Sequence, residues 1–130
     1  MDASKMAWTL SYLENFHLQA GLPVNKALTG QTLKNRMMPL LEEAGETKEA
    51  LHTLGGLLRS VATAGEIREA SLHALKEMMD LRYTIESLCL ALGWDSGEAY
   101  YLVCRSNHTK VSAGAVVVDG QVQKGPNYVK

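Results

Sequence analysis

The sequence predicts an all-α protein, a helix bundle with a short β-hairpin at its C-terminal end. Apolar residues recur at helical spacing through most of the 130 residues, and glycine or proline separates the periodic stretches. Only near the end does the pattern change, to two short β-prone runs around a turn signal. The length suits one hydrophobic core. We therefore expect a single domain spanning residues 1–130.

The first helix is expected over residues 5–19, where apolar residues recur at helical spacing. Gly21, closely followed by Pro23, is a usual way to end a helix. A loop should follow, and either Thr29 or Thr32 can cap the next helix, because a threonine hydroxyl accepts a bond from an unpaired amide.

The second helix should extend to Gly55 and Gly56. Pro39 lies inside it and predicts a kink or a new start, since proline removes one backbone hydrogen bond and clashes with the preceding turn. Residues 57–64 could form a short helix. Residues 66–92 carry the longest helical pattern of the chain, which Gly93 should end.

The last helix is expected to begin at a cap formed by Asp95 or Ser96 and to end near Ser106. Residues 116–118 and 121–123 then predict the two strands of the hairpin. Asp119-Gly120 between them suits a type I′ turn, in which both central residues have positive φ.

Composition argues against several classes of protein. The net charge of -1 provides no field that would attract DNA or RNA, so nucleic-acid binding is not expected. No window approaches the ~20 apolar residues of a membrane span. Cys89 and Cys104 lack CxxC spacing and are expected to be reduced thiols, which suits a cytoplasmic protein.

Two pairs of acids stand out because each has helical i, i+3 spacing. Glu43 and Glu46 lie roughly 60° apart on one helix face, and Glu77 and Asp80 are related in the same way. Each pair borders an apolar stripe. We expect these stripes to pack antiparallel, so that four carboxylates meet at the margin of the bundle. The stripes consist of Leu40, Ala44, Leu51 and Leu54 in one helix and Leu81, Ile85, Leu88 and Leu92 in the other.

Such a cluster needs compensation, because two carboxylates ~4 Å apart repel by about 4 kcal/mol at an effective dielectric of ~20. Apart from Lys48, few basic residues lie inside the two motifs. Oxygen ligands without paired His or Cys select hard cations, so Mg²⁺ is predicted, with Mn²⁺ as an alternative. The spacing alone leaves open that both pairs are ordinary solvated helix faces.

The acid segments Glu42–Glu46 and Glu77–Asp80 resemble the EExxE and ExxD signature of the MazG-type branch of the all-α nucleoside triphosphate pyrophosphohydrolase superfamily. Thr47 departs from the pattern, since the family usually has an apolar residue there. The resemblance extends to Phe16-His17, Gly21–Val24, Arg36, Ser106–Lys110 (similar to SNxxK) and Asp119–Tyr128 (similar to DGKVxKGPNY).

The resemblance implies a role for several residues. Glu43, Glu46, Glu77 and Asp80 would bind Mg²⁺, and Glu42 would be a further ligand or orient the attacking water. The implied substrate contacts are Lys110 and Lys124 to phosphate, Asn107 to sugar, base or phosphate, and Tyr83 stacked on the base.

The implied activity is hydrolysis of a (d)NTP, such as dUTP or dCTP, to (d)NMP and pyrophosphate. Two alternatives remain open: a phosphoribosyl-ATP pyrophosphohydrolase that uses the same acids, and a non-catalytic helical protein that binds a partner through its acidic face. The long amphipathic helices also predict a homodimer or a dimer of dimers, because one chain leaves part of their apolar surface uncovered.

Overall fold

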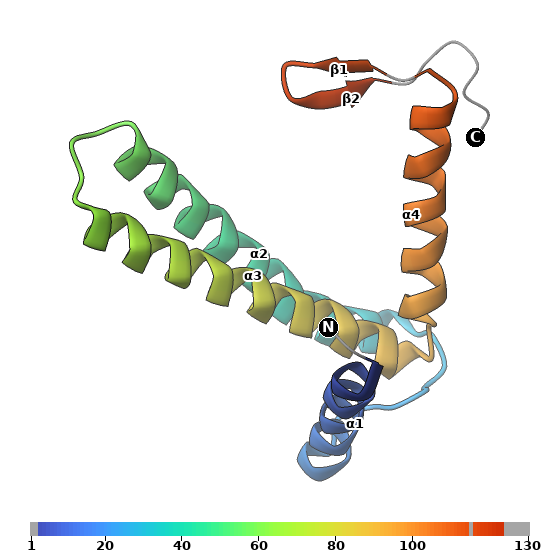
Figure 1. The fold of residues 1–130 in the computed structure, drawn as a ribbon. Coiled ribbons are helices and arrows are strands. Elements are labelled where there is room, and N and C mark those ends of the chain that lie inside the picture. The colour runs from blue at the N-terminus through green and yellow to red at the C-terminus, as the bar shows by residue number, and fades with distance from the viewer. Residues whose placement is uncertain (1–2, 115, 124–130) are drawn as a thin grey trace. The chain divides into compact units, whose positions relative to one another are not determined.

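The computed structural model describes residues 3–114 and 116–123. The all-α prediction is confirmed, and so is the C-terminal hairpin (Figure 1). No helix among the described residues is long and apolar enough to cross a membrane. Backbone contacts divide the chain into two units, Met1–Trp94 and Asp95–Lys130, each described here by itself. The elements are α1 (Ala3–Ala20), α2 (Gly30–Leu58), α3 (Ala64–Leu92), α4 (Ser96–Ser112), β1 (Val116–Val118) and β2 (Gln121–Gln123).

Helices α2 and α3 form an antiparallel hairpin, and lie side by side in Figure 1. The Thr29 hydroxyl caps α2 by accepting a bond from the amide of Thr32 at 3.1 Å. Thr63 caps α3 by accepting from the amide of Glu66, also at 3.1 Å. The predicted short helix over 57–64 is wrong. Its first two residues belong to α2, and the cap at Thr63 starts α3 at Ala64, ahead of the expected start.

Of the two expectations at Pro39, a kink or the start of a new helix, the second is wrong. Helix α2 is continuous from Gly30 to Leu58. A proline removes the amide that would bond to the carbonyl of Asn35. Asn35 is an exposed residue of α2, where solvent can satisfy a carbonyl that has lost its helical partner. Packing of α2 along α3 then outweighs the local cost.

The contact seam is the set of residues through which α2 and α3 pack on each other. In each helix these residues recur at alternating intervals of four and three positions, as is usual for packed helices. Small side chains occupy its centre, with Ala50 and Ala74 only 4% and 2% exposed. Leu51 and Ile85, which were expected in the buried stripes, are instead exposed, because the pair is rotated towards the small residues and covers only one face of each helix. The seam residues are Glu43, Thr47, Ala50 and Leu54 from α2 and Ala70, Ala74, Glu77 and Leu81 from α3.

Helix α1 is joined to α3 through His17, which is fully buried. Its Nδ1 lies 2.8 Å from the carbonyl oxygen of Pro23, which can only accept, so Nδ1 carries the hydrogen. Nε2 therefore accepts a bond from the Ser87 hydroxyl at 2.7 Å. The loop after α1 adds two backbone bonds to α3, from the amides of Asn25 and Lys26. These contacts fix α1 and the loop at the C-terminal end of α3.

In the second unit, α4 begins at the cap formed by Asp95, whose side chain accepts from the amide of Glu98 at 2.9 Å. The helix ends at Ser112, so the predicted end near Ser106 is wrong. Hydroxyl groups in this stretch bond back to carbonyls one turn earlier and remain compatible with the helix. β1 and β2 pair antiparallel, and Asp119 and Gly120 both have positive φ, as a type I′ turn requires.

Candidate metal centre

Three carboxylates meet across the seam of the α2–α3 hairpin. Glu43 comes from α2, while Glu77 and Asp80 come from α3, and one oxygen of each lies within 4.8 Å of the others. The hydroxyl of Thr47 donates a 3.0 Å bond to the backbone carbonyl of Glu77. This buried bond ties α2 to α3 at the acid motifs, which gives a structural role to the residue that departs from the family pattern.

Two of these acids place oxygen atoms in the interior. Glu77 is only 7% exposed. Oε2 of Glu43 and Oε2 of Glu77 are both buried, and neither has a hydrogen-bond partner among the described residues. Leaving a buried acceptor unpaired costs about 1–3 kcal/mol, and more when the group is charged. The cluster therefore calls for a positive charge that reaches these inner oxygens.

Lys76 supplies part of that charge and was not recognised in the sequence. Its Nζ lies 2.7 Å from Oδ2 of Asp80 and 3.6 Å from Oε1 of Glu77. The hydrogen bond to Asp80, and then the charge of that acid, raise the pKa of Lys76. The ammonium is largely exposed and sits at the outer edge of the cluster. It leaves the inner oxygens of Glu43 and Glu77 without a partner.

Glu46 lies beside this group, on the exposed side of α2. Repulsion by the charge of Glu43 raises the pKa of Glu46, with smaller contributions from desolvation and from Glu77. Glu46 therefore interacts electrostatically with Glu43 and Glu77, although the tight group of three does not include Glu46.

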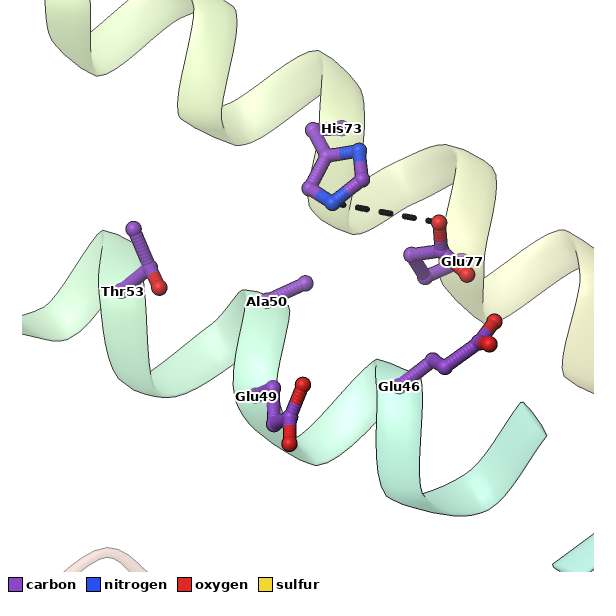
Figure 2. A pocket seen from close by; sticks show the side chains of 6 residues that line it. All are labelled: Glu46, Glu49, Ala50, Thr53, His73 and Glu77. Atoms are coloured by element: carbon purple, nitrogen blue, oxygen red, sulfur yellow. Dashed lines mark ion pairs between the residues drawn. The ribbon is translucent and has the colours of Figure 1, made fainter. Parts of the chain in front are cut away.

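A hollow of about 350 Å³ adjoins the cluster and shares Glu77 with it (Figure 2). Two of its lining residues, Glu49 and His73, were missed in the sequence analysis. Both could have been found from helical spacing, because Glu49 follows Glu46 by three residues and His73 precedes Glu77 by four. The hollow is lined by Glu46, Glu49, Ala50, Thr53, His73 and Glu77.

The remaining predicted site residues are distributed over both units. Glu42 is exposed on α2. Tyr83 is 44% exposed and meets Phe16 of α1 edge to face, with 6.1 Å between ring centroids. On α4 of the second unit, Lys110 donates a 2.9 Å hydrogen bond to the side-chain oxygen of Asn107. Lys124 lies outside the described residues.

The donor set at the three-carboxylate cluster suits Mg²⁺, because its side chains offer only hard oxygens, and Glu43 and Glu77 each have a buried, unpaired oxygen. A divalent ion would offset more of the acidic charge than the single ammonium of Lys76.

Comparison of the sequence with protein-family models finds no match. Comparison with curated proteins also finds no significant match. The resemblance to the MazG-type family therefore rests on the motifs quoted above.

Proposed function

We propose that this chain is a Mg²⁺-dependent nucleoside triphosphate pyrophosphohydrolase that acts on a small-molecule nucleotide in the cytoplasm. The observation that carries the proposal is the pair of buried, unpartnered carboxylate oxygens of Glu43 and Glu77 beside Asp80. Burying acids in a helix seam opposes folding unless a cation joins them. The resemblance of these same acids to the family signature supports this chemistry.

In this reaction a water oxygen attacks the α-phosphorus, and the bond from that phosphorus to the α,β-bridging oxygen breaks. Pyrophosphate leaves with the bridging oxygen, the nucleoside monophosphate keeps the water oxygen, and the proton that the water loses passes to solvent. Glu43, Glu77 and Asp80 would hold the ion, which would supply positive charge to offset the phosphates and lower the pKa of the water. Glu46 adds negative charge beside them, and Glu42 orients the attacking water.

The nucleotide would make its base contact at Tyr83. This residue lies three positions after Asp80 on α3, close to the same helix face, and its ring is partly exposed. The edge-to-face contact with Phe16 holds the ring in place. From the resemblance, Lys110 and Lys124 are proposed to contact phosphate, and Asn107 to contact sugar, base or phosphate.

A second copy of the chain is the proposed partner, as a homodimer or a dimer of dimers. Apolar residues recur on the outer face of α3 at three- and four-residue intervals, at Leu72, Leu75 and Met79, and each is about half exposed. A continuous apolar stripe of this kind is typical of a helix that packs on a further helix. Light scattering on the purified protein tests this, and a monomer at micromolar concentration would contradict it.

The activity is tested by incubating the protein with a panel of NTPs, dNTPs and phosphoribosyl-ATP in Mg²⁺ or Mn²⁺, and by separating monophosphate and pyrophosphate from diphosphate and phosphate. Glu43→Ala and Asp80→Ala should each lower the rate by at least about 100-fold, as loss of one strong electrostatic contact commonly does. Glu14→Ala, an exposed acid on α1, is the matched control and should retain the rate.

The panel also separates the alternatives. Exclusive turnover of phosphoribosyl-ATP would identify the histidine-biosynthesis type of enzyme. If no nucleotide is hydrolysed, or if both alanine variants remain fully active, the carboxylate mechanism is wrong. Metal binding without any turnover would favour the helical partner-binding protein.

A further inference from the structure

We infer that Arg36 binds the pyrophosphate portion of the substrate, about two helical turns along α2 from the acid cluster. Arg36 is half-buried, whereas its neighbours Lys34, Asn35, Met37 and Met38 are all exposed. The inference rests on the proposed function, because it adds to that site a basic residue of the same structural unit. It can nevertheless be tested without any nucleotide.

Arg36 continues the spacing of the contact seam. From Glu43, steps of three and four residues back along α2 reach Leu40 and then Arg36. Arg36 and Glu43 are seven residues apart, which is two helical turns to within about 20°, so both side chains start from the same face of α2. Their separation along the helix axis is about 10 Å. Arg36 therefore belongs to the face that packs on α3, at a different level from the acids.

The charge of Arg36 is left without compensation by the fold. Its Nε is buried and has no hydrogen-bond partner. In the part of the chain that the structure describes, no acid forms an ion pair with this residue. An arginine stays charged in proteins, so it cannot avoid the cost of burial by losing a proton. A guanidinium in this state needs an anion, just as the buried carboxylates need a cation.

The charges along the seam determine on which side of the acid cluster phosphate can lie. Towards the C-terminal end of α2, the adjoining hollow is lined by the acids Glu46 and Glu49 (Figure 2). Their negative charge repels phosphate. Towards the N-terminal end, the next charged residue of the α2 seam is Arg36. The phosphate chain therefore extends from the acid cluster towards Arg36.

The distance from the acids decides which phosphates Arg36 contacts. In the proposed reaction the attacked α-phosphorus lies at the acid cluster, so a group about 10 Å further along α2 meets the β- or γ-phosphate. A guanidinium binds phosphate through two parallel hydrogen bonds, which Nε and one terminal nitrogen can donate. Rotation about the side-chain bonds of Arg36 turns Nε towards the ligand. A cation there also stabilises the negative charge that develops on the leaving pyrophosphate.

Isothermal titration calorimetry of the full chain with inorganic pyrophosphate in Mg²⁺ tests this directly. The wild type should bind pyrophosphate. Arg36→Gln should weaken the binding by at least about tenfold, the scale of one hydrogen bond to a charged group. Arg36→Lys should recover only part of the affinity, because an ammonium keeps the charge but lacks the planar pair of donors.

Lys34→Gln is the matched control. It removes the same charge from the same helix, but Lys34 is exposed and lies two positions away, on another face of α2. This variant should keep the pyrophosphate affinity of the wild type.

A measurement of stability separates binding from a structural role. Without ligand, Arg36→Gln should unfold at the same urea concentration as the wild type or a higher one, because the Nε that it removes has no partner in the fold. A large loss of stability in this variant would make Arg36 a structural residue and would overturn the inference.

If the protein hydrolyses a nucleotide, Arg36→Gln should also raise the KM for that nucleotide. Turnover with unchanged KM and unchanged pyrophosphate affinity in this variant would overturn the inference and leave the proposed enzyme in place. Absence of pyrophosphate binding by the wild type would overturn it as well. Pyrophosphate binding that depends on Arg36, together with no turnover of any nucleotide, would support the anion position while rejecting the proposed enzyme.

Discussion

Two buried polar clusters in the α1–α3 unit differ in one respect, the pairing of their polar atoms. In the first, both ring nitrogens of His17 have partners, the Pro23 carbonyl and the Ser87 hydroxyl. In the second, Glu43 and Glu77 each keep a buried oxygen that no described residue pairs with. The two clusters lie at different levels of the same helix, α3, and each contains a buried residue of that helix, Ser87 in the first and Glu77 in the second.

The difference separates a structural role from a functional one. A buried polar group with all its bonds made adds modestly to stability and fixes how the elements meet. A buried carboxylate without a partner costs free energy, so it opposes the fold that holds it. The His17 cluster therefore attaches α1 to α3, whereas the acid cluster is the place for which we propose a ligand.

The largest expected effect is on the histidine cluster. His17→Ala should lower the free energy of unfolding by about 2–4 kcal/mol, because it leaves a cavity and strands the Ser87 hydroxyl in the interior. Urea unfolding followed by circular dichroism measures this loss. Ser87→Ala, which removes only one hydroxyl, should cost less. If His17→Ala is as stable as the wild type, the cluster is not the attachment that we describe.

The course of the helices could be predicted because it follows from apolar spacing, Gly93 and the caps. Their ends were less predictable. Either Thr29 or Thr32 could cap α2, and only the backbone conformation selects Thr29. The sequence analysis did not recognise Thr63 as a cap, and it therefore predicted an additional helix over 57–64 that the structure does not contain.

The sequence predicted the acids of the candidate site but not the residues around them. Helical spacing places Glu77 and Asp80 on one face, yet the rotation of α2 against α3 decides that Glu77 is buried while Glu46 is exposed. That rotation depends on small seam residues whose effect is not visible in an acid motif. Lys76 and His73 were missed because neither matches the signature, although helical spacing places both beside Glu77.

Substitution in the acid cluster should change the free energy of unfolding in the opposite direction to substitution in the histidine cluster. In metal-free protein, Glu77→Met should raise the free energy of unfolding by about 1–2 kcal/mol, because an apolar side chain replaces a buried charge. With Mg²⁺ at a hundred times its Kd, the wild type should gain about 2.7 kcal/mol and Glu77→Met nothing. Urea unfolding in EDTA and in Mg²⁺ measures both effects. A destabilised metal-free Glu77→Met would mean that both buried clusters are structural.

The smallest expected effect concerns the pH dependence of stability and arises from Glu46. Its pKa is raised in the folded protein, chiefly by the charge of Glu43, so the folded chain holds this proton more tightly than the unfolded chain. The contribution of Glu46 to stability is therefore present below its ordinary pKa and is lost as the pH rises through the raised value.

Glu46→Gln should remove this part of the pH dependence in metal-free protein, because the amide stays neutral. Urea unfolding of both proteins in EDTA at a series of mildly acidic pH values gives the difference in slope. Mg²⁺ should also diminish the slope of the wild type, since a bound cation offsets the repulsion that raises the pKa. Identical slopes for wild type and Glu46→Gln would show that Glu46 does not share the charge of the cluster, and would limit the metal centre to Glu43, Glu77 and Asp80.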